Sequence, residues 1–181
     1  MYTRQELDAF KDNNMQDGHM YIVIESGNNS EHFFIIPRDK IIKHSGLIKS
    51  MVDDDDTPFL DVPIPYPEVN DKALTYVSYY ITHDNKSTVE QPLITAWVDC
   101  VNKWEIEYMN ALTNNKQDNT FMYDVLNHAH YMDSRELILL CCSYIADIIK
   151  DHTPEEIRDI LALESAHPPP TEHTNIIFED V

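Results

Sequence analysis

The sequence contains nine histidines, the residue type in it most able to bind a metal ion. His128 and His130 are two positions apart, which on a helix places their side chains roughly 200° apart, so they cannot share one ion there. His167 and His173 flank three prolines, without cysteine or carboxylate ligands at a recognised zinc spacing. Packed or solvated histidines are therefore favoured over a metal site.

The acidic run at 53–56 raises the possibility of calcium binding. An EF-hand loop needs ligands at alternate positions, a central glycine and a distal glutamate, and none of these follow the run. We expect a solvated acidic loop. The sequence also has no Gly-x-Ser-x-Gly motif, and its 3 glycines form no phosphate-binding loop. We expect no catalytic residues, no metal, no cofactor and no enzymatic activity.

Three cysteines offer a further candidate chemistry, because adjacent cysteines sometimes form a thiol site. Cys141 and Cys142 lie in an apolar run, which raises a thiol pKa rather than lowering it, so core packing is favoured. With Cys100 they make an odd number, which indicates buried thiols in a reducing compartment rather than disulfides. Trp97 and Trp104 can be read equally as interface anchors or as half-buried structural residues.

The charge balance narrows the class of partner. Lys and Arg number 13 against 32 Asp and Glu, a net charge of −19, which repels nucleic-acid phosphates and anionic membrane surfaces. No apolar run approaches the roughly 20 residues that cross a bilayer. The 181 residues suit one domain, with or without arms, and the polar first residues do not resemble a targeting leader. We expect no nucleic-acid or membrane partner, only proteins with basic patches.

The amino-terminal half predicts a small sheet with helices. Two runs rich in β-branched and aromatic residues, MYIVI and HFFII, flank a glycine and two asparagines and so indicate a hairpin. The run at 60–65 alternates, and its prolines restrict it to a short edge strand. The expected elements are a short helix with a Thr3–Glu6 capping box, strands at 20–24 and 32–36, a helical stripe within 37–52 with Ser45 as a cap, an edge strand at 60–65, and a helix capped by Asn70.

The carboxyl-terminal half predicts helices. Helical patterns cover 93–112, 121–130 and 134–150, and 137–142 are apolar on every side, which places them in the core. In HTPEEIRDIL, Thr153 is the N-cap, Pro154 takes the first helical position and Glu156 closes a capping box. Three consecutive prolines then end helical structure and predict an extended tail.

Short motifs, taken in order, resemble the Skp family of S-phase kinase-associated proteins. KHSGLIKSMVDD at 43–54 is similar to a family stretch in which a lysine, a serine and an Ile-Lys-x-Met core precede an acidic loop. VPIP and 69–83 resemble its Val-Pro-Leu-Pro, Val-Asn and Thr-His segments, and WEIEYM at 104–109 resembles its Trp-Asp-x-Glu-Phe-Leu. TPEEIR is the most specific match. The resemblance covers roughly residues 20–163.

The resemblance implies an α+β fold, a BTB/POZ-type domain followed by carboxyl-terminal Skp-like helices. It also implies a non-catalytic adaptor of an SCF-type cullin-RING ubiquitin ligase, which bridges a cullin and F-box proteins in ubiquitin-dependent degradation. Elongin C, a near relative, ends before the counterpart of 143–163, so the Skp branch is preferred. The expected arrangement is an amino-terminal arm at 1–19, a BTB/POZ-like domain at 20–133, F-box-binding helices at 134–163 and a proline-containing tail at 164–181.

By position, the resemblance also assigns two partner-binding surfaces. The family's cullin-binding Asn-Tyr pair falls on His130 and Tyr131, so the tyrosine is kept and the asparagine is replaced. The alternative is that Tyr131 only closes a helix. The F-box side falls on Ile145, Ile149, Pro154, Ile157, Ile160 and Leu161. The alternative for the last three is packing on the chain's own core.

The sequence departs from the family most clearly in its tail. The family continues with an acidic helix whose tryptophan completes the F-box clamp, whereas this tail has prolines and NIIFEDV, with Phe178 as a candidate substitute. Such divergence fits a copy from a pathogen or virus, acting in the cytoplasm or nucleus of a host. A second interpretation is a BTB/POZ-derived structural or decoy protein that self-associates through its sheet edge and has lost F-box binding. The oligomeric state stays open, with a homo-oligomer as one option.

Overall fold

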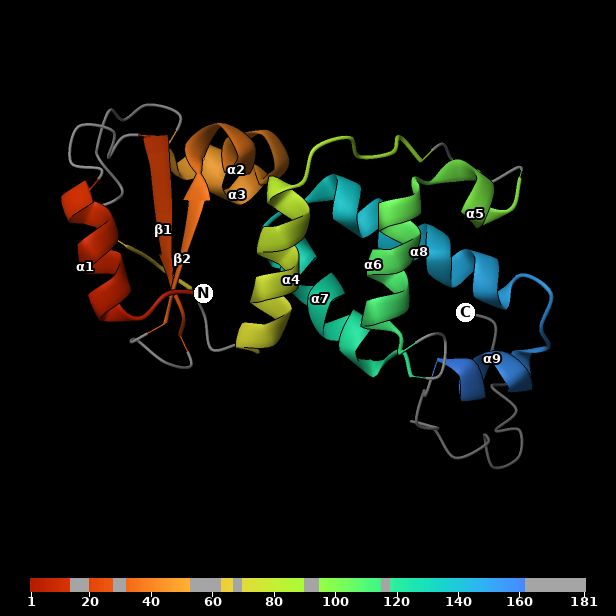
Figure 1. The fold of residues 1–181 in the computed structure, drawn as a ribbon. Coiled ribbons are helices and arrows are strands. Elements are labelled where there is room, and N and C mark those ends of the chain that lie inside the picture. The colour runs from red at the N-terminus through yellow and green to blue at the C-terminus, as the bar shows by residue number, and fades with distance from the viewer. Residues whose placement is uncertain are drawn as a thin grey trace, which may run out of the picture.

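A computed structural model describes residues 1–13, 20–27, 32–52, 63–66, 70–89, 95–114 and 118–161. It shows an α+β fold in which a small sheet and helix α1 lie at one end and helices α5 to α9 lie toward the other (Figure 1). The predicted fold class is confirmed. The predictions for the 53–56 loop and for the tail concern residues outside the described ranges.

The sheet has three strands in the order β2-β1-β3. Strands β1 (Tyr21–Glu25) and β2 (Phe33–Pro37) form an antiparallel hairpin, and β3 (Ile64–Pro65) lies parallel to β1 at the other edge. Proline lacks the N–H needed to continue a ladder, which is consistent with the edge position of β3. The predicted hairpin is confirmed, each strand beginning one residue later than expected. The edge strand predicted over 60–65 is confirmed at Ile64–Pro65, and 60–62 lie outside the described residues.

Alternate residues of the hairpin pack against different helices, as the two-residue period of a strand requires. Ile22, Ile24, Phe34 and Ile36 join the main core, whereas Val23 and Phe33 pack with Leu7 of α1 (Arg4–Asn13). Helix α1 begins where the sequence predicts, because Thr3 N–H donates to Glu6 Oε2 at 2.7 Å. The first residues therefore form a helix that covers one face of the sheet (Figure 1).

The predicted helical stripe within 37–52 is two helices, α2 (Arg38–His44) and α3 (Gly46–Val52). Ser45 lies between them and caps the second, since its hydroxyl oxygen accepts from Ile48 N–H at 3.2 Å. Ile48 and Val52 are buried, but Met51 is 48% exposed, so it does not belong to the inward stripe.

Helix α4 (Asp71–Thr82) begins at the cap that the sequence predicts, and one side of it is buried. The Asn70 side chain accepts from Lys72 N–H at 3.0 Å. The buried residues recur at helical spacing: Ala73, Leu74, Val77, Tyr80 and Ile81.

The prediction of one helix over 93–112 is wrong. The described residues form a short α5 (Trp97–Cys100) and a separate α6 (Lys103–Leu112). The chain breaks because Asn102 N–H donates to Glu105 Oε2 at 3.0 Å and so starts a new helix, while Val101 is extended. Buried Glu105 also accepts from Ser87 N–H at 3.2 Å, which ties the preceding loop to this helix start.

The last three helices lie close to the predicted positions: α7 (Thr120–Tyr131), α8 (Arg135–Ile149) and α9 (Pro154–Ile160). Leu137, Leu140 and Cys141 are buried in α8, but Cys142 is exposed, which corrects the expectation that 137–142 lie wholly in the core. The helix turns its next position, Ser143, inward instead, where the Ser143 hydroxyl accepts from Trp97 Nε1 at 3.0 Å. In the described part of the chain, no helix is long and apolar enough to span a membrane.

Candidate partner-binding surfaces

The first predicted surface is the carboxyl end of α7. His130 is exposed and Tyr131 is 48% exposed, so the structure places both predicted residues side by side at the surface. The Tyr131 ring meets buried Tyr66 edge to face, with centroids 5.0 Å apart, and Tyr66 stacks on His128 at 5.6 Å. Tyr131 therefore packs on Tyr66 at the helix end while about half of its side chain stays exposed.

The turn that follows Tyr131 is fixed by the junction of α2 and α3. The Ser45 hydroxyl donates to the carbonyl oxygen of Met132 at 2.7 Å, and Gly46 N–H donates to that of Asp133 at 3.1 Å. A Cβ on Gly46 would lie 1.9 Å from Asp133 Oδ2, so any larger residue here would force the Asp133 side chain to move. The front and rear halves of the chain thus position Tyr131 together.

The residues behind Tyr131 are uncharged near neutral pH. Burial lowers the pKa of His128, and burial raises the pKa of the Tyr66 hydroxyl. His128 Nδ1 and the Tyr66 hydroxyl lie 3.3 Å apart and share a hydrogen bond. The pair is a packed support for Tyr131 rather than a proton-transfer site.

The second predicted surface lies at the end of α8 and on α9. Ile145 packs against the core while remaining half-buried, Ile149 is half-buried, and Pro154 is exposed. No residue of α9 is buried, and the predicted apolar face of Ile157, Ile160 and Leu161 is half-buried. These three side chains are therefore surface-facing rather than part of the buried core.

Helix α9 is held at both ends despite its lack of buried residues. At its start, Thr153 N–H donates to Glu156 Oε2 at 2.8 Å, and Glu156 N–H donates to Thr153 Oγ1 at 3.4 Å. These Thr153 bonds hold the pKa of the Glu156 carboxyl below its usual value. At its end, Asn119 Nδ2 donates to the Ile160 carbonyl at 3.1 Å. The helix is fixed by polar contacts, which leaves its apolar side chains available.

The two surfaces lie at opposite ends of α8. Tyr131 precedes the first turn of this helix, whereas Ile145 and Ile149 lie in its last turns. The 15 residues of α8 span about 22 Å at 1.5 Å per residue. The two surfaces are therefore well separated along the chain's longest described helix.

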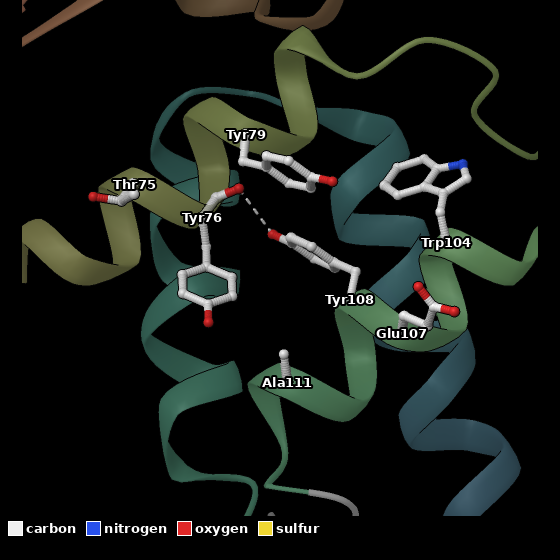
Figure 2. A pocket seen from close by; sticks show the side chains of 7 residues that line it. All are labelled: Thr75, Tyr76, Tyr79, Trp104, Glu107, Tyr108 and Ala111. Atoms are coloured by element: carbon white, nitrogen blue, oxygen red, sulfur yellow. Dashed lines mark hydrogen bonds between the residues drawn. The ribbon is translucent and has the colours of Figure 1, made fainter.

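A third feature was not predicted from the sequence. Helices α4 and α6 enclose an aromatic groove of about 390 Å³ (Figure 2), lined by Thr75, Tyr76, Tyr79, Trp104, Glu107, Tyr108 and Ala111. Of these residues, sequence reasoning singled out Trp104 alone. A usable signal is the helical spacing of Tyr76 with Tyr79 and of Trp104 with Tyr108, which places each pair on one side of its helix.

The described residues contain no group of three or more histidine, cysteine or acidic side chains arranged to hold a metal ion. His128 is buried and His130 exposed, so the two face different environments. Burial raises the pKa of the Cys141 thiol to about 12, which makes it a packing residue rather than a nucleophile.

Comparison with known proteins finds a family model and several relatives that match this chain. The model of the "Skp1 family, dimerisation domain" matches residues 135–168. The chain is 32% identical to the S-phase kinase-associated protein 1 homolog of Tetrahymena thermophila over 123 residues, 66% of this chain and 70% of that protein. It is 29% identical to SKP1-like protein 9 of Arabidopsis thaliana over 144 residues, 80% and 84% of the two chains. It is 27% identical to the E3 ubiquitin ligase complex SCF subunit sconC of Talaromyces marneffei over 135 residues, 73% and 79%.

The fold is thus a small mixed sheet followed by helices, with exposed or half-buried aromatic and apolar residues near both ends of α8. The chain belongs to the Skp1 family, whose adaptors are non-catalytic subunits.

Proposed function

We propose that this protein is an adaptor of an SCF-type cullin-RING ubiquitin ligase, which bridges a cullin and F-box substrate receptors. The observation that carries the proposal is α9: a well-capped helix without a buried residue, inside the segment that matches the Skp1 family model. A partner that covers this apolar face removes it from water and thereby stabilises the helix. The SCF subunits among its relatives support the same role.

The cullin is proposed to bind at His130 and Tyr131. Tyr131 supplies a rigid, half-exposed aromatic ring, a residue type common at the centres of interfaces. The cullin patch that meets this surface should be basic, because the chain carries a net charge of −19. The histidine at 130 gives the pair a chemistry that asparagine lacks, so it bears on which cullin binds.

The F-box protein is proposed to bind the end of α8 together with α9. Half-buried isoleucines and a rigid proline suit an apolar helix of a partner, which binds through residues spaced at helical intervals. The residues proposed for this surface are Ile145, Ile149, Pro154, Ile157, Ile160 and Leu161. We also propose the division of the chain into an arm at 1–19, a BTB/POZ-like domain at 20–133, F-box-binding helices at 134–163 and a tail at 164–181. Action in the cytoplasm or nucleus is part of the same proposal.

A second candidate function is a self-associating structural or decoy protein. The description of the matched model as a dimerisation domain favours it. Against association through the outer edge of β2, Tyr2 already pairs with this edge: Tyr2 N–H donates to the Phe33 carbonyl at 2.7 Å, and Phe33 N–H donates to the Tyr2 carbonyl at 2.8 Å. An edge strand that is already paired is a poorer template for a second chain.

Co-purification tests the proposal. The tagged full chain, mixed with purified candidate cullins and F-box proteins, should retain one of each class. Retention of neither class would contradict the adaptor role. Removal of the residues after Leu163 separates the two candidates, because F-box binding that survives this truncation places the clamp in α8 and α9 and weakens the decoy interpretation.

A further inference from the structure

The aromatic groove between α4 and α6 has a rigid floor and an open rim. Tyr108 forms the floor, since it is buried and its hydroxyl donates to the Tyr76 carbonyl at 3.1 Å (Figure 2). Tyr79 stands at the rim, 53% exposed, and its ring stacks on Tyr108 with centroids 6.3 Å apart. Trp104 is held at the opposite wall because its Nε1 donates to the Asn85 carbonyl at 3.1 Å. The fold therefore fixes these rings before any ligand arrives.

Such a groove fits a proline-rich segment. Proline presents a flat apolar ring on a backbone that is already extended, so it docks between aromatic side chains at a low entropic cost. Glu107 is the charged residue of the lining, and the remaining lining residues are aromatic or small. The groove consequently favours an apolar, rigid ligand that is neutral or weakly cationic.

The chain carries such a segment itself. Pro168, Pro169 and Pro170 are consecutive, and they stand between His167 and His173, whose protonated forms are compatible with Glu107. A proline-rich segment on the same chain acts at an effective concentration of about millimolar, which a separate peptide rarely reaches. The prolines therefore have an advantage over a partner's segment if the chain can reach the groove.

The described residues show that the chain leaves α9 close to the groove. The Ile160 carbonyl is bonded to Asn119, at the start of α7. Two residues further on, Phe121 meets Tyr76 of the groove edge to face, with centroids 5.3 Å apart. Six residues lie between Leu161 and Pro168, and the seven extended steps from one to the other reach about 23 Å. The path they have to cover runs from the Ile160 carbonyl along Asn119 and Phe121 to Tyr76, which are linked by direct contacts.

We propose that the proline segment 168–170 docks into the aromatic groove of its own chain, between Tyr79 and Trp104. The groove is then a binding site for polyproline segments, and the tail is its resident ligand. A proline-rich segment of another protein would have to displace the tail. This proposal does not depend on the SCF role, because it concerns neither of the two proposed partner surfaces.

Nuclear magnetic resonance of the full chain tests the proposal against a variant, Pro168→Ala with Pro169→Ala and Pro170→Ala. The unaltered chain should show nuclear Overhauser contacts between proline δ protons and the ring protons of Tyr79 and Trp104. The variant should lose these contacts and shift the Trp104 indole N–H signal. The Trp97 indole serves as an internal reference, since it is 2% exposed and bonded to Ser143.

A groove variant completes the test. Tyr79→Ala, in the unaltered tail background, should abolish the proline contacts, whereas Tyr131→Ala, at a similarly exposed tyrosine elsewhere, should leave them intact. An unchanged Trp104 signal in the triple alanine variant would overturn the proposal. A Trp104 signal that depends on protein concentration would overturn it too, in favour of a second copy as the occupant.

Discussion

The Ser45 hydroxyl donates a 2.7 Å hydrogen bond to the Met132 carbonyl, and both residues are buried. The contact joins the break between α2 and α3 to the turn after Tyr131. It makes the proposed cullin surface depend on residues that are far apart in the sequence.

Replacing this serine should destabilise the fold. In Ser45→Ala, Ile48 N–H loses its cap and Met132 keeps only the weaker bond from Leu47 N–H at 3.3 Å. We expect the free energy of unfolding to fall by about 1–2 kcal/mol in chemical denaturation. Ser50→Ala is the matched control, because Ser50 is exposed, and it should change stability by less than about 0.5 kcal/mol. Equal effects would mean that the Ser45 contact does not hold the turn.

The cap of α9 should matter for F-box binding more than for the core. Thr153→Ala removes the bonds that start α9, at about 1 kcal/mol of helix stability, and should weaken F-box binding in calorimetry. Cullin binding should stay unchanged, because Tyr131 lies at the other end of α8. Thr3→Ala, which removes the equivalent capping box of α1, is the control and should leave F-box affinity intact. Loss of F-box binding in both variants would point to a general effect on folding.

A charge on the α7 surface should affect the cullin alone. Tyr131→Lys removes the ring contact with Tyr66 and puts an ammonium group at the proposed cullin surface, so it should reduce cullin affinity at least about tenfold, equivalent to about 1.4 kcal/mol. F-box affinity should not change. Val98→Lys is a matched control, since Val98 is also 48% exposed but lies on α5. Parallel loss of both partners in Tyr131→Lys would instead indicate misfolding.

Stability should fall with pH below about 6.5, the titration range of an unfolded histidine. Burial lowers the pKa of His44 and of His128, so the unfolded chain binds protons that the folded chain does not. Their contribution is complete above pH 6.5 and is lost as the pH falls through the lowered values. Unfolding measured between about pH 7.5 and 5 avoids most carboxylate titration. The double variant His44→Gln, His128→Gln should show a smaller slope, and an unchanged slope would assign the loss to other groups.

Local signals predicted much of this fold. Thr3, Asn70 and Thr153 begin helices where their spacing indicates, because a cap needs only its own turn. The break before α6 was missed even though Asn102 and Glu105 carry a capping-box spacing, since the surrounding apolar residues continue a helical pattern. The prediction that Cys142 is buried is wrong because 137–142 are all apolar, so the sequence pattern does not indicate which side of α8 faces the core.

The candidate surfaces divide in the same way. Tyr131 and the α9 face are at least partly exposed because they lie at or near the ends of helices, and capping residues and prolines in the sequence locate such ends well. The aromatic groove arises where α4 packs beside α6, and the contact of Tyr108 with Tyr76 joins residues that no local pattern relates. The turn at Asp133 likewise receives a hydrogen bond from Gly46 N–H, a contact between distant residues that only the folded chain reveals.

Native mass spectrometry of the 21.1 kDa chain, mixed with a cullin and an F-box protein, tests the adaptor role most directly. We expect a ternary complex with one copy of each protein, because the two proposed surfaces lie about 22 Å apart along α8. A spectrum with only homodimers, or with binary complexes that exclude each other, would contradict the proposal that this chain bridges the two.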